Sequence, residues 1–340
     1  MAAIDAAARE LGGELGVDGP ALLRERQNTL GLAAAGTVSA GGTCRLVRGA
    51  DRWFALNLAR RDDVDAVAAW MAREYTTPVW DAVSDAARGM AAVDAVERAQ
   101  LLGIPAAVAI APEEYDGATV TVQPGEPRGR ASPRERPPMV VDLSQLWAGP
   151  LCTKLLGEAL GARVVKVEHL GRPDGARAGP PAFWRSLNAR KEERHLDFDT
   201  ATGRAELAEL LAHARVIVTA SRPRVHAALG VDRARLAARG ATWVSITGYG
   251  LEGPRSGWVA FGDDAAVAGG LAVAAGAPDA PVFAGDAVAD PLAGLAAAVV
   301  AARLVRGRRG GVVDVAMAGV VNRALRAHGG PAQPTPPAQG

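Results

Sequence analysis

An aspartate directly before a proline is the residue best placed to do chemistry. Asp290 and Pro291 lie near the head of VADPLAGLAAAVVAA (288–302), a long run of helix-forming residues. A proline suits the first turn of a helix, and a carboxylate in front of it can accept the free backbone N–H groups there. Residue chemistry alone therefore favours a helix-capping role for Asp290. The same helix end can also hold the carboxylate ionised.

Glycines and basic residues form two further candidate features. The segment SAGGTCRL (39–46) contains the adjacent Gly41 and Gly42, which by themselves indicate a loop leading into a β-hairpin. Lys191, Arg222 and Arg224 carry charges of the kind that meet the phosphates of a nucleotide, although a single basic residue is more often a solvated surface charge.

Cysteines and histidines are not spaced as metal ligands. Cys44 and Cys152 lie far apart and form no CxxC pair, so we expect buried, reduced thiols and no disulfide. The five histidines show no paired spacing. No metal is expected.

Composition and charge exclude several classes of partner. The 38 Lys and Arg residues against 37 Asp and Glu leave a net charge of +1, so nothing favours nucleic acid or an anionic membrane. The start of the chain lacks the pattern of a signal peptide, and the longest apolar stretch, 292–305, is too short to span a bilayer. We expect a cytoplasmic protein with neither nucleic acid nor a membrane as its partner.

Residues 139–328 alternate between strand and helix patterns. Near-continuous apolar runs, typical of strands buried on both faces, occur at 140–144, 163–168, 215–220 and 242–250. Helical segments lie between them, and the pattern predicts an α/β domain with a parallel sheet and flanking helices. Ligands of such sheets bind beyond the carboxyl ends of the strands. The first strand runs into Ala148-Gly149-Pro150 without a GxGxxG pattern, which argues against an oxidoreductase.

The preceding residues, 1–121, predict a smaller α+β domain. Two strand-like segments flank Ala50-Asp51 and suggest a hairpin, with helices over 62–73 and 79–99. For residues 1–35 the default expectation is a helical brace. The proline- and charge-rich segment 122–138 is predicted to be a linker, and 329–340 a disordered tail.

A series of short motifs resembles one enzyme family. DLSQLWAGP (142–150) and LGARVVKVE (160–168) look like the opening of the class III CoA-transferases, the CaiB/BaiF type that includes formyl-CoA transferase. Further matches follow in the same order and spacing: GAR (175–177), LNARK (187–191), LDF (196–198), SRP (221–223), LGVD (229–232), SITGYGLEGP (245–254), FGDDAAVAGGL (261–271), VADPLAGL (288–295) and GGVVDVAM (310–317).

This resemblance implies a fold, a reaction and a set of site residues. It implies a Rossmann-like CoA-binding domain in which Asp290 is the nucleophile, forming an aspartyl anhydride and then an aspartyl-CoA thioester. Gly41 and Gly42 would belong to the loop that closes on the acyl site. Coenzyme A would be a substrate, with no permanently bound cofactor. The residues implied in binding are Trp147, Ala148, His169, Asn188, Arg190, Lys191, Ala220, Ser221, Arg222 and Asp263.

Departures from the family pattern leave alternatives open. Segment 36–110 resembles the family's second half yet comes first, so the chain looks circularly permuted, and a homodimer is implied without its interlocked topology. His169 and Ala228 stand where relatives commonly have basic residues. An acyl-CoA racemase is one rival, although its histidine is missing from 261–264 and Asp263 would have to substitute. A non-catalytic CoA-binding protein is another.

Overall fold

The larger of two sheets has the strand order of a Rossmann-like fold. The computed structural model describes residues 1–127, 137–221, 225 and 230–329. Its larger sheet has seven strands in the order β4-β10-β9-β8-β5-β6-β7. Read from β7 to β10, the parallel strands follow the chain order 3-2-1-4-5-6. The bounds are β4 (Val120–Pro127), β5 (Met139–Asp142), β6 (Arg163–His169), β7 (Glu192–Leu196), β8 (Val216–Thr219), β9 (Thr242–Thr247) and β10 (Arg309–Ala316). The predicted α/β fold is confirmed.

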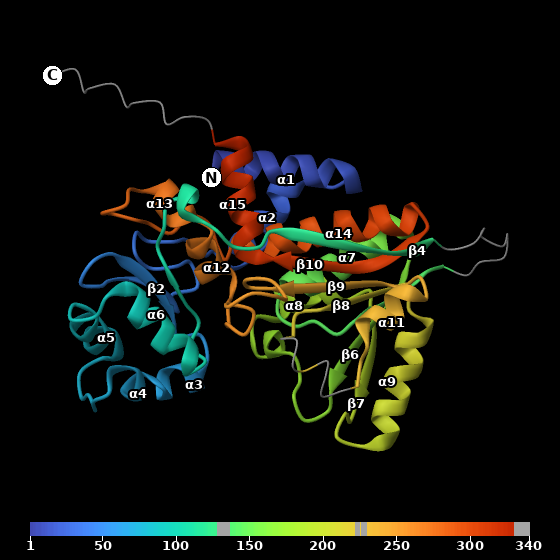
Figure 1. The fold of residues 1–340 in the computed structure, drawn as a ribbon, viewed down its shortest axis with the longest axis horizontal. Coiled ribbons are helices and arrows are strands. Elements are labelled where there is room, and N and C mark those ends of the chain that lie inside the picture. The colour runs from blue at the N-terminus through green and yellow to red at the C-terminus, as the bar shows by residue number, and fades with distance from the viewer. Residues whose placement is uncertain (128–136, 222–224, 226–229, 330–340) are drawn as a thin grey trace.

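Helices cover both faces of this sheet (Figure 1). In β8, Val216 and Val218 pack on the side of α7 and α14, whereas Ile217 points the opposite way and packs with α9 and α11. The helices of this part are α7 (Ala148–Leu160), α8 (Pro181–Asn188), α9 (Ala201–His213), α11 (Arg233–Ala238), α12 (Gly262–Ala268), α13 (Leu271–Ala275), α14 (Ala289–Arg306) and α15 (Met317–His328), with a short 3-10 helix η2 (Gly175–Ala178). None of the described helices is long and apolar enough to cross a membrane.

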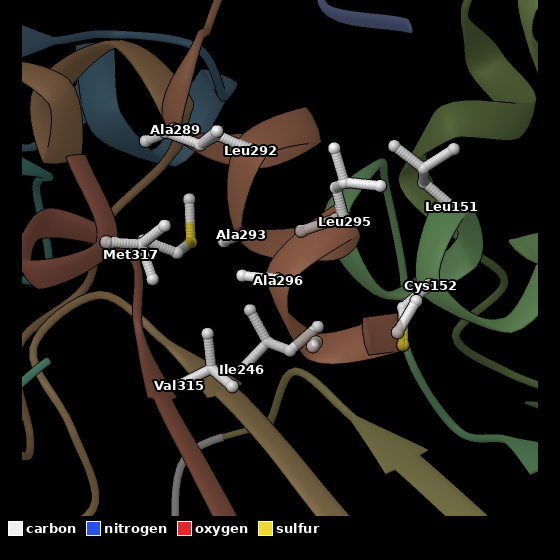
Figure 2. Close-up of a cluster of buried hydrophobic side chains, with 14 of the residues drawn as sticks. Leu151, Cys152, Ile246, Ala289, Leu292, Ala293, Leu295, Ala296, Val315 and Met317 are labelled. Atoms are coloured by element: carbon white, nitrogen blue, oxygen red, sulfur yellow. The ribbon is translucent and has the colours of Figure 1, made fainter. Parts of the chain in front are cut away.

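Helix α14 lies at the centre of the main core. Figure 2 shows Leu292 and Leu295 of α14 in one cluster with Leu151 of α7 and Ile246 of β9. Small residues fill most of the other buried positions of α14. Because these small side chains occupy little space between α14 and α7, the two helices can pack at short range.

The closest point of that packing is a glycine. A Cβ atom added at Gly294 would lie 2.5 Å from the carbonyl oxygen of Ala148, the first residue of α7. Asp290 lies one helical turn before Gly294 and therefore on the same side of α14. The close approach thus brings Asp290 beside the start of α7.

A second, smaller sheet is formed by the predicted hairpin and one added strand. β1 (Cys44–Arg48) pairs antiparallel with β2 (Trp53–Asn57), and β2 pairs with β3 (Ala106–Val108). The surrounding helices are α3 (Arg61–Asp65), α4 (Val67–Met71), α5 (Val79–Ala87) and α6 (Ala92–Leu101), followed by the 3-10 helix η1 (Pro112–Glu114). Each of the two long helices predicted here is thus two shorter ones.

The structure differs from the predicted domain division at two places. Residues 122–127, predicted to be linker, belong to β4, which pairs antiparallel with β10. The helices α1 (Ala2–Leu15) and α2 (Gly19–Leu30) pack through Ile4 and Leu23 into the main core of the larger sheet, not against the small sheet. The remainder of the predicted linker, 128–136, and the predicted tail beyond Gly329 lie outside the described residues.

Replacing Gly294 with alanine tests the close approach of α14 and α7. The new Cβ would meet the Ala148 carbonyl oxygen at 2.5 Å, so the helices must separate, and we expect the free energy of unfolding to fall by about 1–3 kcal/mol. Gly13→Ala in α1 is the matched control, because nothing lies within 4 Å of its added Cβ and alanine should stabilise that helix by about 0.5–1 kcal/mol. Urea unfolding compares them; equal stability of Gly294→Ala and the natural chain would contradict the prediction.

Candidate active site

The strand order creates a crevice at the carboxyl ends of β5 and β8. The chain leaves β5 toward one edge of the sheet and leaves β8 toward the other, and ligands bind at such a switch point. The loop after β5 carries Trp147, and the loop after β8 carries Ala220 and Ser221. Ala220 is exposed, and the Ser221 N–H donates to the Thr219 hydroxyl at 3.1 Å. Arg222 and Arg224, also predicted here, lie outside the described residues.

Buried charges fix the turn that follows β5. Leu146 adopts a left-handed conformation, φ 66°, which costs energy for a residue with a side chain. Its N–H donates to Asp174 Oδ1 at 2.9 Å. Lys166 Nζ lies 3.0 Å from Asp174 Oδ2 and donates to the Ser144 carbonyl, also at 3.0 Å. The turn is held from both sides by an ion pair with 0% exposure.

A second buried ion pair changes the expected role of Lys191. Its Nζ donates to Asp142 Oδ2 at 2.9 Å and to the Pro150 carbonyl at 2.8 Å, and the side chain is 2% exposed. Burial would raise the pKa of Asp142, but the ammonium groups of Lys191 and Lys166 outweigh it and hold that pKa well below its usual range. Lys191 was predicted to meet a phosphate, whereas here its charge is buried against Asp142.

Asp290 lies in the first turn of α14 but does not cap it. The cap residue is Val288, with no side-chain hydrogen bond, so the predicted capping role is wrong. The Asp290 N–H instead donates to the Ala287 carbonyl at 2.9 Å, where Ala287 has a φ of 44°. A Cβ added at Gly262 would lie 2.4 Å from Asp290 Oδ2, so the carboxylate rests against backbone that only glycine leaves open.

Other carboxylates surround Asp290. Asp263 of α12 is 9% exposed and accepts the Ala287 N–H at 3.0 Å, and Asp286 is fully buried. Burial raises the pKa of Asp290 to about 7, opposed by Arg26 and reinforced by the charges of Asp263 and Asp286. Burial likewise raises the pKa of Asp263 to about 6. Neighbouring acids that titrate near neutral pH are typical of catalytic sites.

Arg26 of α2 is the cation that faces this cluster, and sequence reasoning missed it. Its Nε lies 3.1 Å from Asp286 Oδ2. Its guanidinium lies 5.2 Å from the ring centre of Trp147 and 5.8 Å from that of Phe183. No signal in the sequence separates Arg26 from its neighbours Arg24 and Glu25, because charge clusters on a helix usually mark a solvated face.

The predicted glycine loop does reach this cluster. Gly41 and Gly42 are exposed, and Gly42 has a φ of 77° that favours glycine. A Cβ at Gly41 would lie 3.3 Å from a terminal nitrogen of Arg26. The buried Ser39 hydroxyl, at the start of the loop, accepts the Cys44 N–H at 3.2 Å and also hydrogen-bonds to Asp263, lowering its pKa.

The small sheet contributes one more contact to this region. Asn57, at the end of β2, donates from Nδ2 to Asp264 Oδ1 at 3.0 Å. Asp264 is fully buried beside Asp263, and burial raises the pKa of Asp264 to about 7. The acidic cluster therefore lies between the two sheets.

Two other predicted binding residues, Trp147 and Asn188, are buried, and each has one side-chain polar atom without a hydrogen-bond partner among the described residues. Trp147 is 2% exposed and meets Phe183 edge to face at 5.1 Å, next to Ala148 at the start of α7. Asn188, also 2% exposed, donates to the Trp184 carbonyl at 3.2 Å. Among the described residues neither Trp147 Nε1 nor Asn188 Oδ1 has a hydrogen-bond partner. Such buried atoms are suited to a bound ligand.

His169 at the end of β6 lies near two acids, the partly buried Asp197 and the exposed Asp199. Its Nδ1 accepts the Gly171 N–H at 2.9 Å, and its Nε2 lies 3.3 Å from Asp199 Oδ2 and 3.7 Å from Asp197 Oδ1. These three side chains are close enough to hold a metal ion. However, an Nδ1 that accepts a hydrogen bond leaves the imidazole neutral with its proton on Nε2, so the nitrogen that faces the acids has no free lone pair for a metal ion.

A cationic cavity lies between α7 and α8. It has a volume of about 400 Å³. Arg190, predicted to bind coenzyme A, lines it together with Lys154 and Arg185, and Arg190 is 4.0 Å from Glu158. Phe183, in the same helix α8 as Arg185, touches Trp147. The cavity therefore shares helices α7 and α8 with the aromatic pair that lies beside Arg26.

Comparisons with known proteins identify relatives of the larger part. Residues 138–332, more than half of the chain, match the family described as CoA-transferase family III. Succinyl-CoA–D-citramalate CoA-transferase of Chloroflexus aurantiacus is 30% identical over 201 residues, 53% of this chain and 50% of that protein. Mouse succinyl-CoA:glutarate CoA-transferase is 34% identical over 184 residues, 50% of this chain and 42% of that protein. The solved structure of a CAIB/BAIF family protein from Brucella suis is 26% identical, with 56% and 55% coverage and a TM-score of 0.48. The chain spans about half the length of the curated relatives it matches.

Removing one partner of the buried ion pair should be costly. Asp142→Asn leaves the Lys191 ammonium group buried without a counter-charge, and we expect the free energy of unfolding to fall by about 3–5 kcal/mol. Glu192→Gln is the control, because its partner Arg163 is 53% exposed and such pairs contribute less than about 1 kcal/mol. Thermal and urea unfolding measure both. Similar small losses in the two variants would show that the buried Asp142–Lys191 pair contributes no more to stability than an exposed ion pair.

Proposed function

This chain belongs to CoA-transferase family III, and from that premise we propose that it moves coenzyme A from an acyl-CoA thioester to a carboxylic acid. The observation that carries the proposal is the position of Asp290. Its half-buried carboxylate lies at the carboxyl edge of a Rossmann-like sheet, beside the turn before α7 and in contact with the backbone of Gly262. A carboxylate in such a place can reach a ligand in the crevice.

The proposed reaction uses Asp290 as a nucleophile in two matched halves. Its carboxylate oxygen attacks the thioester carbonyl carbon and the C–S bond breaks. CoA departs as the thiolate, and a mixed anhydride between Asp290 and the donor acid is formed. The thiolate then attacks the Asp290 carbonyl carbon and expels the donor acid, leaving an aspartyl-CoA thioester. The acceptor carboxylate attacks that thioester and releases the thiolate again. The thiolate finally attacks the acceptor's acyl carbon, which yields the new acyl-CoA and restores the carboxylate.

The electrostatics of the cluster suit this chemistry. With a pKa raised to about 7 by burial, Asp290 is a more basic carboxylate than an exposed one, yet part of it is ionised at neutral pH. Each tetrahedral intermediate needs hydrogen-bond donors for its oxyanion, and the anhydride must be kept from water. The Gly41-Gly42 loop beside Arg26 is our candidate for that closure.

We place the anionic end of CoA in the cavity between α7 and α8. Lys154, Arg185 and Arg190 offer charges for its phosphates in place of the buried Lys191. Lys154 follows Trp147 by seven residues, about 10 Å along α7. An extended ligand anchored at these cations could place its thiol end beside Trp147 and the acidic cluster.

One observation favours a second candidate, an acyl-CoA racemase. Asp263 lies beside Asp290, and burial raises the pKa of both groups to near neutral, about 6 and about 7. Two such acids are what proton removal and return at an α-carbon require. Asp263, however, already accepts the Ala287 N–H at 3.0 Å, and we therefore prefer transfer.

The chain order, assembly and compartment belong to the same proposal. We regard segment 36–110 as the family's second half moved in front of the matched range 138–332. The contact between Asn57 and Asp264 is compatible with a shared site. A homodimer and a cytoplasmic location remain predictions.

Trapping a covalent adduct tests the nucleophile. We expect the protein incubated with succinyl-CoA, acetyl-CoA or oxalyl-CoA to gain a hydroxylamine- or borohydride-trapped modification on the peptide that contains Asp290. Asp290→Asn should abolish both the adduct and CoA transfer, whereas Asp279→Asn, an exposed control, should keep them. Peptide mass spectrometry reads the result.

Other outcomes of that experiment select among the alternatives. Unchanged transfer by Asp290→Asn would refute the assignment. No adduct together with deuterium uptake at the α-carbon of a 2-methylacyl-CoA would favour the racemase. Tight CoA binding with neither would favour a non-catalytic CoA-binding protein.

Removing the cavity's cations should weaken CoA binding. In a double Arg185→Ala and Arg190→Ala variant we expect the dissociation constant for CoA to rise by about tenfold or more, since charge-assisted hydrogen bonds contribute about 1.5–3 kcal/mol each. Arg239→Ala, exposed just beyond α11 on the opposite face of the sheet, is the control. Isothermal titration calorimetry measures all three proteins. Unchanged affinity in the double variant would exclude this cavity as the phosphate site.

A further inference from the structure

Helix α2 delivers one charged side chain to the candidate site. The helix lies outside the family-matched range 138–332 and is capped by Asp18, whose side chain accepts the Ala21 N–H at 3.0 Å. Leu23 is 1% exposed and anchors α2 in the main core. Arg26 follows three residues later and so lies on the same, inward face. The direction of Arg26 is therefore set by the packing of α2.

The guanidinium of Arg26 is held from several sides. It lies 5.2 Å from the ring centre of Trp147 and 5.8 Å from that of Phe183, a placement that suits a cation over aromatic faces. Its Nε is 3.1 Å from Asp286 Oδ2, and a terminal nitrogen approaches Gly41. With 24% of the side chain exposed, Arg26 is both fixed and reachable.

Three carboxylates lie close enough to Arg26 for its charge to act on them. Asp263 comes from α12, Asp286 from the segment before α14, and Asp290 from the first turn of α14. Arg26 lowers the pKa of each of them, against burial, which raises it. The Gly262 N–H gives Asp290 further stabilisation as an anion. Closely spaced buried carboxylates cannot all ionise, so a cation among them influences which ones do.

We infer that Arg26 is a positioning residue for Asp290. Arg26 pairs with Asp286 and thereby favours the ionised form of Asp290, which is the form that attacks. The inference rests on the proposed function, because it assumes that the ionised carboxylate of Asp290 is the reactive form. The pairing removes the repulsion that a bare Asp286 anion would exert on Asp290. The positive charge of Arg26 also acts directly on Asp290 and favours its ionised form.

The sign of the pH dependence follows from this arrangement. The reactive form of Asp290 is the anion, so adduct formation should rise with pH through a midpoint near the pKa of about 7. Arg26→Gln removes the cation, raises the pKa of Asp290 and shifts the midpoint upward by about one unit or more. At pH 7 the rate should fall several-fold and recover in alkaline buffer. Asp286→Asn should shift the midpoint in the opposite direction, because it removes an anion and frees the cation.

Two readouts separate this inference from the proposed function. The first is the rate of succinyl-CoA adduct formation at Asp290 from pH 5 to 9. The second is the titration of the Asp290 carboxyl ¹³C resonance, identified as the signal missing from Asp290→Asn, which needs no turnover. Arg24→Gln is the matched control on the same helix, because Arg24 pairs with Asp5 at 2.6 Å and not with the cluster. Arg26→Lys keeps a positive charge, so its midpoint should lie closer to that of the natural chain than the midpoint of Arg26→Gln does.

The outcomes are distinct. An upward shift in Arg26→Gln and a downward shift in Asp286→Asn, with Arg24→Gln unchanged, support the inference. Unshifted titration in a folded Arg26→Gln overturns it. If Arg26→Gln loses its native melting transition, Asp286→Asn decides, and an unchanged or raised midpoint overturns the inference. Absence of any adduct in the natural chain would refute the proposed function, while the carboxyl titration would still test Arg26.

Discussion

The close approach of α14 to α7 is the constraint on which the rest of the candidate site depends. It requires a residue without a side chain at Gly294, where a Cβ would meet the Ala148 carbonyl at 2.5 Å. Asp290 is one turn away on the same side of α14, so the helix packing that builds the main core also sets the distance between the carboxylate and the turn after β5. The four-residue spacing from Asp290 to Gly294 therefore serves both the packing of α14 on α7 and the placement of the carboxylate.

Two groups of buried charges on either side of that contact are arranged very differently. Around Asp142, Lys191, Lys166 and Asp174, anions and cations alternate and most of their atoms are hydrogen-bonded, so the charges serve to fix a backbone turn. Around Asp290, acids outnumber cations among the described residues, where Arg26 is the cation that acts on all three, and burial raises the pKa values of the acids. The first arrangement stabilises; the second leaves protonation states that a ligand or a change of pH can alter.

Sequence patterns predicted what local chemistry determines. Continuous apolar runs gave the main parallel strands, and turn residues at Ala50-Asp51 gave the hairpin, because both depend on nearby residues. The Gly41-Gly42 loop and Asp290 came from resemblance and do lie at one cluster. Sequence reasoning could not supply what distant segments decide. The strand β4 has the composition of a linker but is paired by β10, and Lys191, expected near a phosphate, has its charge buried against Asp142. Arg26 differs from Arg24 in the face of α2 that it occupies.

The strand β4 also has a mechanical consequence. It connects the small sheet's part of the chain directly into the seven-stranded sheet through backbone hydrogen bonds with β10. Side-chain bonds elsewhere, such as those of Gln100 to Val259 and of Asn322 to Pro112, join the same two parts. The connection between the two parts is therefore held by hydrogen bonds along its length and does not behave as a flexible linker. Rotation of one part against the other would have to break these strand and side-chain hydrogen bonds together.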